Sequence, residues 1–231
     1  MNALPFTFCG AALHARPSGA LHWPEQNTLV VSDLHLGKAE RMARRGGPIL
    51  PPYEVIETLD RLLDDIAKTQ PRTVICLGDS FDDLAAARAT QSAVSERLAP
   101  ALAGRRWVWI EGNHDPGPVD LSGEHLGEIT IGPLTFRHIA QPTAPGEISG
   151  HYHPKARVRL KGRTITRRCI LVDDMRMILP AYGTYTGGLF SHEPVLTDLM
   201  NPNARAILMG PVPTALPMPR AARSSWAAPL H

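Results

Sequence analysis

The chain has 231 residues, 43% of them hydrophobic, and its 24 basic and 22 acidic side chains leave a formal net charge of +2. This length suffices for one large or two small domains, and the balanced charge argues neither for nor against a nucleic acid partner. The three cysteines are odd in number and far apart, which argues against a disulfide framework or a zinc knuckle and suits a reducing cytosol. Because no apolar run approaches the roughly 20 residues that span a bilayer and no signal-peptide pattern is present, we expect a cytoplasmic protein without membrane contact.

The first half of the chain alternates between apolar strands and helical patterns. The N-terminal segment is predicted to form a hairpin or two edge strands, at residues 6–16 and 20–23. Three apolar runs predict buried strands at residues 27–32, 73–77 and 106–110. Apolar residues at three- and four-residue steps, and an Ala-rich stretch, predict helices at residues 53–68 and 84–98. This alternation indicates an α/β fold with parallel central strands.

The second half consists of short β-like runs separated by Gly and Pro. They predict strands at residues 128–131, 134–138, 147–149, 156–160, 163–171 and 205–209. We therefore expect a second, more antiparallel sheet packed on the first: an α/β fold of two packed mixed β-sheets flanked by helices. A Gly- and Thr-rich loop is expected at residues 179–188. We predict one domain over residues 1–209 and a poorly ordered Pro-, Ala- and Arg-rich tail over residues 210–231.

Polar side chains that can bind metals follow the ends of these strands. They are Asp33, His35, Asp79, Asn113, His114, His138, His151 and His153. Taken singly, each is as readily a turn or cap residue. Ligand sites in parallel sheets, however, lie beyond the carboxyl ends of the strands, so the set predicts one shared site. Carboxylate, imidazole and amide donors without a thiolate suit Mn²⁺, Fe²⁺ or Zn²⁺.

In order and spacing, these residues resemble the motifs of the calcineurin-like metallophosphoesterases. The motifs are Asp33-Leu34-His35, Gly78-Asp79, Gly112-Asn113-His114-Asp115, His138 and Gly150-His151-Tyr152-His153. Two longer stretches, residues 32–41 and 179–188, resemble one branch of that family, the bacterial ligase-associated DNA-damage-response endonucleases. The resemblance implies a four-layer αββα sandwich.

The resemblance also implies two divalent metal ions, most readily Mn²⁺, with Fe²⁺, Zn²⁺ or Ni²⁺ as alternatives. The ligands of the first ion would be Asp33, His35 and His153. The ligands of the second ion would be Asn113, His138 and His151. Asp79 would bridge the two ions.

By the same resemblance, His114 would protonate the leaving group or stabilise the negative charge that develops on it, and Asp115 would orient its ring. One departure from the family pattern concerns Asp83, which stands where many relatives carry an Arg. This departure affects the expected substrate contacts rather than the metal ligands.

Two basic segments are candidate substrate contacts. The first follows His35 and contains Lys38, Arg41, Arg44 and Arg45. The second alternates basic and apolar residues after His153 and contains Arg157 and Arg159, which share one strand face. Either could hold the phosphates of a nucleic acid. The competing interpretation of the second is a solvated edge hairpin whose charges deter aggregation.

The predicted function is metal-dependent hydrolysis of phosphodiesters, with DNA in repair as the expected substrate. The branch resemblance implies DNA, a DNA ligase and a helicase or exonuclease as partners, and a homodimer is one candidate assembly. Two alternatives stay open: a phosphoesterase acting on nucleotides or cyclic phosphates, and a non-catalytic metal-stabilised scaffold in a repair complex.

Overall fold

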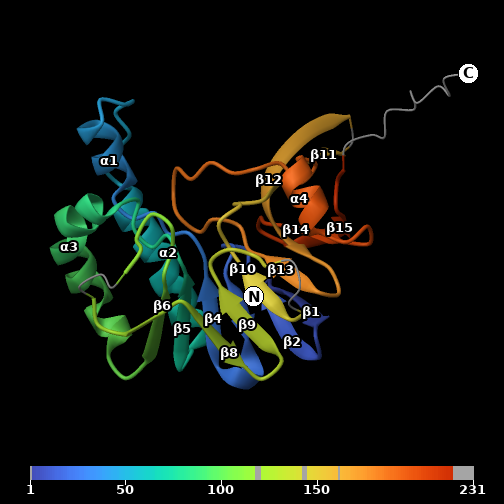
Figure 1. Ribbon diagram of the computed structural model, residues 1–231, viewed down its shortest axis with the longest axis horizontal. Coiled ribbons are helices and arrows are strands. Elements are labelled where there is room, and N and C mark those ends of the chain that lie inside the picture. The colour runs from blue at the N-terminus through green and yellow to red at the C-terminus, as the bar shows by residue number, and fades with distance from the viewer. Residues whose placement is uncertain (1, 118–120, 142–144, 161, 221–231) are drawn as a thin grey trace, which may run out of the picture.

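The computed structural model describes residues 2–117, 121–141, 145–160 and 162–220. These residues form two β-sheets packed face to face, with helices on both outer faces (Figure 1). The predicted α/β class and its four layers are confirmed.

The first sheet has the strand order β1-β2-β3-β4-β5-β6-β7. Its strands are β1 (Leu4–Phe8), β2 (Ala11–Ala15), β3 (Leu21–Trp23), β4 (Thr28–Val31), β5 (Thr73–Leu77), β6 (Arg106–Ile110) and β7 (Glu124–Leu126). The pairs from β4 to β7 are parallel and those from β1 to β4 are antiparallel. A short 3₁₀ helix, η1 (Pro24–Gln26), leads into β4.

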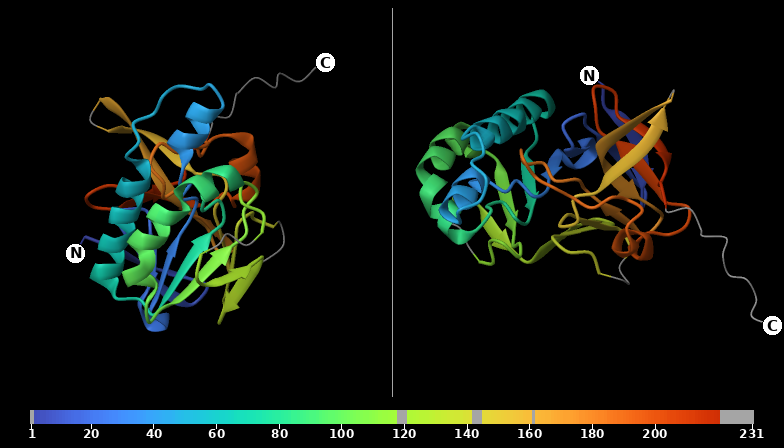
Figure 2. Two further views of the ribbon diagram at one scale, coloured as in Figure 1. Left: turned by 90° about the vertical axis from the view of Figure 1, so that its left-hand side faces the viewer. Right: turned by 90° about the horizontal axis from the view of Figure 1, so that it is seen from above.

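Helices α2 (Glu54–Thr69) and α3 (Leu84–Leu102) lie side by side on the outer face of this sheet (Figure 2). Helix α1 (Lys38–Arg44) lies beyond the strand ends and contacts α3 (Figure 1). In β5, Val74 and Cys76 pack toward these helices, whereas Ile75 and Leu77 pack toward the second sheet. This alternation follows from the two-residue period of a strand, and it confirms that the central strands are buried on both faces. No helix among the described residues is long and apolar enough to cross a bilayer.

The second sheet has the order β15-β14-β12-β13-β10-β9-β8, and β11 pairs with β12 outside this path. Its strands are β8 (Glu128–Ile131), β9 (Leu134–Arg137), β10 (Glu147–Ser149), β11 (Lys155–Leu160), β12 (Arg163–Val172), β13 (Arg176–Ile178), β14 (Arg205–Leu208) and β15 (Thr214–Pro217). Only the pairs of β10 with β9 and with β13 are parallel among the described strands of this sheet. Helix α4 (Pro194–Leu199) packs Leu196 on its outer face.

The N-terminal segment has one strand more than the sequence predicted. The run at residues 6–16 is divided by a two-residue turn at Cys9 and Gly10, whose φ angles of 45° and 80° are both left-handed. Two such residues form the tight hairpin turn that suits the twist of neighbouring strands. The break was missed because Cys is not among the residues that usually occupy the first position of this turn.

The boundary predicted for the C-terminal tail is wrong. Thr214–Pro217 pairs with β14 as β15, and Met218 is buried against Ala204 and Leu208. Arg220 donates hydrogen bonds to the carbonyls of Thr197 and Met200 at the end of α4. Residues 221–231 lie outside the described part of the chain, and the single domain stays a prediction.

We expect Met218→Ala to lower the free energy of unfolding by about 2–5 kcal/mol, because it leaves a cavity in the core between β14, β15 and α4. Val212→Ala is the control in the same segment, since Val212 is 65% exposed and its truncation should change stability by less than about 0.5 kcal/mol. Urea denaturation measures both. Equal and negligible effects would show that the segment adds no packing.

Candidate metal centre

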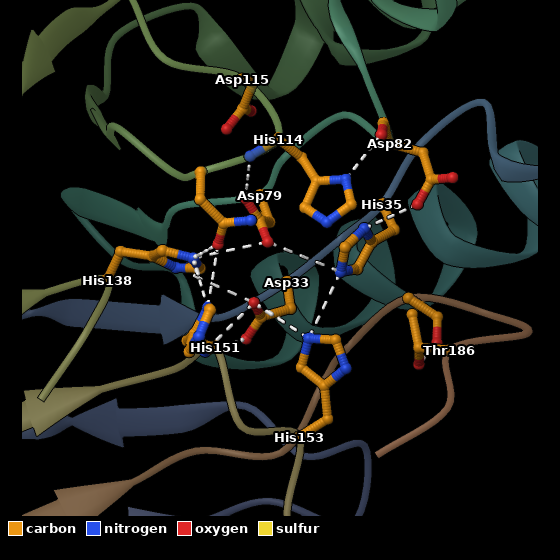
Figure 3. A network of polar contacts seen from close by, with 12 residues as sticks. Asp33, His35, Asp79, Asp82, His114, Asp115, His138, His151, His153 and Thr186 are labelled. Atoms are coloured by element: carbon orange, nitrogen blue, oxygen red, sulfur yellow. Dashed lines mark hydrogen bonds and ion pairs between the residues drawn. The ribbon is translucent and has the colours of Figure 1, made fainter. Parts of the chain in front are cut away.

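The structure brings the predicted polar side chains together where strands of both sheets end. Asp33 and His35 follow β4, Asp79 follows β5, and Asn113 and His114 follow β6. The second sheet contributes His138 after β9, and His151 and His153 after β10. Figure 3 shows the imidazoles of His35, His138, His151 and His153 turned toward the carboxylates of Asp33 and Asp79.

The backbone of this site is held in a conformation that most side chains avoid. Five of its residues have left-handed φ angles between 44° and 67°: Asp33, His35, Asp79, His151 and His153. Asp and His tolerate this region better than bulky residues, but each instance still costs about 1–3 kcal/mol. Such a concentration of strain is typical of functional sites, where the surrounding fold imposes it.

Two glycines let the carboxylates sit against neighbouring backbone. A Cβ atom at Gly112 would collide with the backbone nitrogen and carboxylate of Asp79, and one at Gly150 would collide with Ser32 and Asp33. Each carboxylate is thereby bound by main-chain donors. The N–H of His114 donates to Asp79 Oδ1 over 2.8 Å, and the N–H of His151 donates to Asp33 Oδ2 over 3.0 Å.

The potential ligands form two neighbouring groups. In the first, Asp33 Oδ1 lies 3.1 Å from Nε2 of His153, which lies 3.3 Å from Nε2 of His35. In the second, Asp79 Oδ2 lies 3.4 Å from Nε2 of His138. Asp79 Oδ2 also lies 3.9 Å from His35 Nε2, so this carboxylate stands between the groups, where a bridging ligand must be.

The second group is completed by His151 and Asn113. The Nδ1 atom of His151 lies 3.3 Å from His138 Nε2, and Asn113 Oδ1 lies 2.9 Å from both of these nitrogens. Asp33, His35, Asp79 and His138 are buried, His151 and His153 are half-buried, and Asn113 is exposed. The site thus has a buried floor and one open side.

Hydrogen-bond acceptors of the site face one another, and this arrangement requires a cation between them. His138 Nδ1 lies 2.9 Å from the carbonyl oxygen of Leu77, which can only accept, so Nδ1 carries the hydrogen. The Nε2 atom of the neutral ring is then an acceptor, yet it faces the acceptor oxygens of Asn113 and Asp79. A proton or a metal ion must therefore lie between them, and the mixed carboxylate, imidazole and amide donors fit a divalent transition metal.

The pKa values of the buried groups also show that the site favours positive charge. Burial alone would lower the pKa of His138, but the hydrogen bond to Asp79 and the charges of Asp33 and Asp79 raise it. Burial would raise the pKa of Asp79, but His138 and the His114 N–H lower it to about 2. The negative charge is therefore permanent at neutral pH, and protons and metal ions compete for the imidazoles.

Asp82, for which no role was predicted from the sequence, lies behind the ligands and contacts His35 and His114. Its buried carboxylate lies 2.8 Å from His35 Nδ1, and its carbonyl oxygen lies 2.8 Å from His114 Nδ1. The first contact leaves His35 Nε2 facing the metal groups, which is how a second carboxylate commonly orients a metal-binding histidine. The only signal in the sequence was its place three residues after Asp79.

The predicted role of Asp115 in orienting the His114 ring is wrong. The carboxylate of Asp115 accepts a hydrogen bond from the N–H of Phe81 over 3.1 Å, and Figure 3 shows it on the far side of the backbone from the imidazole. Burial raises the pKa of Asp115 to about 7, an effect that the Phe81 N–H opposes and the charge of Asp79 reinforces. Asp115 therefore fixes the turn after Asp79, and the carbonyl of Asp82 orients the ring.

The first basic segment lies on α1 and the turn after it, beside the site. Its cations form ion pairs with acidic side chains. Asp82 is 3.3 Å from Lys38 Nζ and 2.9 Å from Arg41 Nη1. Asp83, which also caps α3, is 2.7 Å from Arg44 Nη2 and 3.6 Å from Arg45 Nη2. Two cations beside Asp82 also oppose the binding of a metal ion there, although His35, Asp82 and His114 form a third cluster of potential ligands.

A hollow of about 320 Å³ adjoins the second group on its open side. Its lining is mostly polar and includes Glu111, Asn113, Glu128, Arg137, His138 and Gln141. The guanidinium of Arg137 pairs with Glu128 over 2.9 Å. The hollow is large enough for a nucleotide-sized group beside the metal centre.

Similarity to known proteins identifies the family of the chain. No curated protein matches the chain. Among solved structures, the crystal structure of the Pseudomonas putida nuclease MPE is similar, with a TM-score of 0.72 and 27% sequence identity over 94% of this chain and 100% of that chain. Residues 27–210 match the family model described as calcineurin-like phosphoesterase. The match covers most of the sequence, and the chain therefore belongs to the calcineurin-like phosphoesterase family.

Proposed function

We propose that the protein is a metal-dependent phosphodiesterase that cleaves DNA. The observation that carries this proposal is the convergence of two aspartate–histidine groups on Asp79 with the half-buried His114 beside them. When bound, two divalent ions would hold the phosphate oxygens and activate a water molecule for attack on phosphorus. Mn²⁺ is our first candidate, with Fe²⁺, Zn²⁺ or Ni²⁺ as alternatives.

The ligand sets follow from the two groups. Asp33, His35 and His153 would hold one ion. Asn113, His138 and His151 would hold the other, with Asp79 shared between them. His35 and His138 are suited to this task because each has its Nδ1 engaged, by Asp82 and by the Leu77 carbonyl, which leaves Nε2 for the metal.

His114 is our candidate for the general acid. Its Nδ1 donates to the Asp82 carbonyl, which fixes the orientation of the ring and leaves Nε2 free for the substrate. As the P–O bond to the leaving group breaks, Nε2 would give its proton to the departing oxygen, so that an alcohol leaves and a phosphate monoester remains. Asp115 would contribute by fixing the turn that carries Asp79.

A nucleic acid substrate is supported by the similar Pseudomonas putida protein, which is described as a nuclease, and the choice of DNA rests on the resemblance to the DNA-damage-response branch. A role in DNA repair, with a DNA ligase and a helicase or exonuclease as partners, rests on the resemblance of residues 32–41 and 179–188 to that branch of the family. The hollow beside Asn113 and His138 favours a second candidate, a phosphoesterase for nucleotides or cyclic phosphates. Counterion release separates the two, because cleavage of a long polyanion weakens steeply with salt.

We expect His114→Ala to lower kcat by about 10²–10⁴-fold because it removes the proton donor, while Mn²⁺ content and melting temperature stay unchanged. Single-stranded DNA, duplex DNA and bis-p-nitrophenyl phosphate are assayed side by side. His125→Ala is the control, since His125 lies on β7 outside the site. Unchanged DNA hydrolysis by the His114 variant would contradict the general-acid role, and a variant that still repaired DNA as well as the wild type would favour a scaffold.

Replacing the shared carboxylate should remove metal. We expect Asp79→Asn to bring the Mn²⁺ content below two ions per chain, because the amide cannot supply a bridging negative charge. Elemental analysis after gel filtration measures the content. The control is Asp64→Asn, an exposed carboxylate of α2 that pairs only with Lys68 among the described residues. Full occupancy in the Asp79 variant would refute the bridge.

The neighbouring aspartates Asp82 and Asp83 offer a matched pair. We expect Asp82→Asn to weaken Mn²⁺ binding by about 10–100-fold, because the Nδ1 atom of His35 loses its charged partner 2.8 Å away. Asp83→Asn removes the same charge one residue away and should leave Mn²⁺ affinity within a factor of two, since Asp83 contacts α1 and α3 but not the ligands. Isothermal titration calorimetry measures both. Equal losses would indicate a general effect of charge.

A further inference from the structure

Strands β11 and β12 form a ribbon that projects beyond the body of the second sheet (Figure 1). Its register pairs Arg157 with Thr166 and Arg159 with Thr164, and residues directly opposite in an antiparallel pair share a face. These four side chains are exposed. One face of the ribbon therefore presents Lys155, Arg157 and Arg159 in a row beside two hydroxyl groups.

The cations of this face have no acidic partner within ion-pair distance among the described residues. No Asp or Glu occurs between residues 155 and 172. The contrast with the first basic segment is direct, because Lys38, Arg41, Arg44 and Arg45 all lie within 4 Å of Asp82 or Asp83. Of the two segments, only the ribbon keeps its positive charge available to a ligand.

An aromatic side chain holds the first two cations in place. The guanidinium carbon of Arg157 lies 4.5 Å from the centre of the Phe190 ring, and Lys155 Nζ lies 4.9 Å from it. The ring of His192 stacks on Phe190 at 5.4 Å. A contact with a ring face orders a guanidinium without occupying its N–H donors, as a carboxylate would do. Arg157 is thus ordered and still able to bind an anion.

Backbone hydrogen bonds join this face to the metal centre. The N–H of Leu189 donates to the Tyr152 carbonyl, and the N–H of Lys155 donates to the Leu189 carbonyl. Gly188 packs so closely on His153 that a Cβ atom there would collide with the His153 carbonyl. The row of cations therefore begins two residues after His153 and has a fixed position relative to it.

We propose that this face binds the sugar–phosphate backbone of a DNA strand and leads it to the His153 side of the metal centre. The proposal rests on the proposed function and adds the path of the substrate. Alternate residues of a strand advance about 6.6 Å, so the row from Lys155 to Arg159 extends over about 13 Å.

The test compares two pairs of substitutions on opposite faces of the same ribbon. Arg157→Gln with Arg159→Gln removes two charges from the proposed face. Arg163→Gln with Arg167→Gln removes two exposed charges from the other face, since Arg163 lies opposite Leu160 and Arg167 opposite Ala156. Binding of a fluorescein-labelled 20-nucleotide single strand is measured by anisotropy on the full chain, in EDTA so that no cleavage occurs, over a range of salt concentrations.

We expect the Arg157/Arg159 variant to bind about tenfold more weakly and the slope of log K against log salt to fall by about 1.4, or about 0.7 for each lost phosphate contact. The Arg163/Arg167 variant should stay within twofold of the wild type. Equal effects of both pairs, or no effect of the first, would overturn the proposal, as would competition by polyglutamate as effective as by unlabelled DNA.

The result is separable from the proposed function. If the wild-type protein with Mn²⁺ hydrolyses neither DNA nor bis-p-nitrophenyl phosphate, the proposed function fails whatever the ribbon binds. If it hydrolyses both and the two faces bind DNA alike, the path along the ribbon fails and the proposed function stands.

Discussion

The structure depends on one unfavourable interaction, the crowding of acceptor atoms where the two sheets meet. Asp33 and Asp79 are buried, and imidazole nitrogens whose hydrogens are used elsewhere face them and each other. Without a cation these atoms repel one another, because lone pairs and carboxylate charges point at a common centre in a medium that screens them weakly. The affinity of the site for positive charge is therefore built in by the fold before any ion binds.

The same crowding explains why the backbone around the site is strained. Five residues in left-handed conformations aim their side chains inward, and Gly112 and Gly150 admit close contact with the carboxylates. Regular strands could not do this, since their side chains alternate between faces. The strain is sustained by the apolar core between the sheets, in which Val30, Ile75 and Val108 pack against Phe136 and Ile148. Core and site are thus two consequences of one packing of sheet on sheet.

The sequence predicted the parts of this arrangement whose signals are local. The strands at residues 73–77 and 106–110 are found as predicted, because apolar residues on both faces leave no competing pattern. β15 was missed because its Pro-rich surroundings resemble a disordered tail, and its pairing with β14 is a tertiary contact. Asp82 was left without a role and Asp115 was given the wrong partner for a related reason: which neighbour a turn carboxylate contacts depends on side-chain direction, and spacing along the chain does not specify it.

The two basic segments have similar compositions but different contacts, and the contacts determine which of them can bind an anion. Both follow a predicted metal-binding histidine, and by composition alone they are equivalent. The cations of α1 face Asp82 and Asp83, so they stabilise the carboxylate behind His35, and their charge is largely neutralised. The cations of β11 face an aromatic ring and solvent, so their charge remains. A polyanion gains most where cations are ordered and unpaired, because neither an acidic partner nor side-chain entropy opposes its binding. By that criterion the substrate is expected to approach over the ribbon, while the cations of α1 stabilise the carboxylate behind His35.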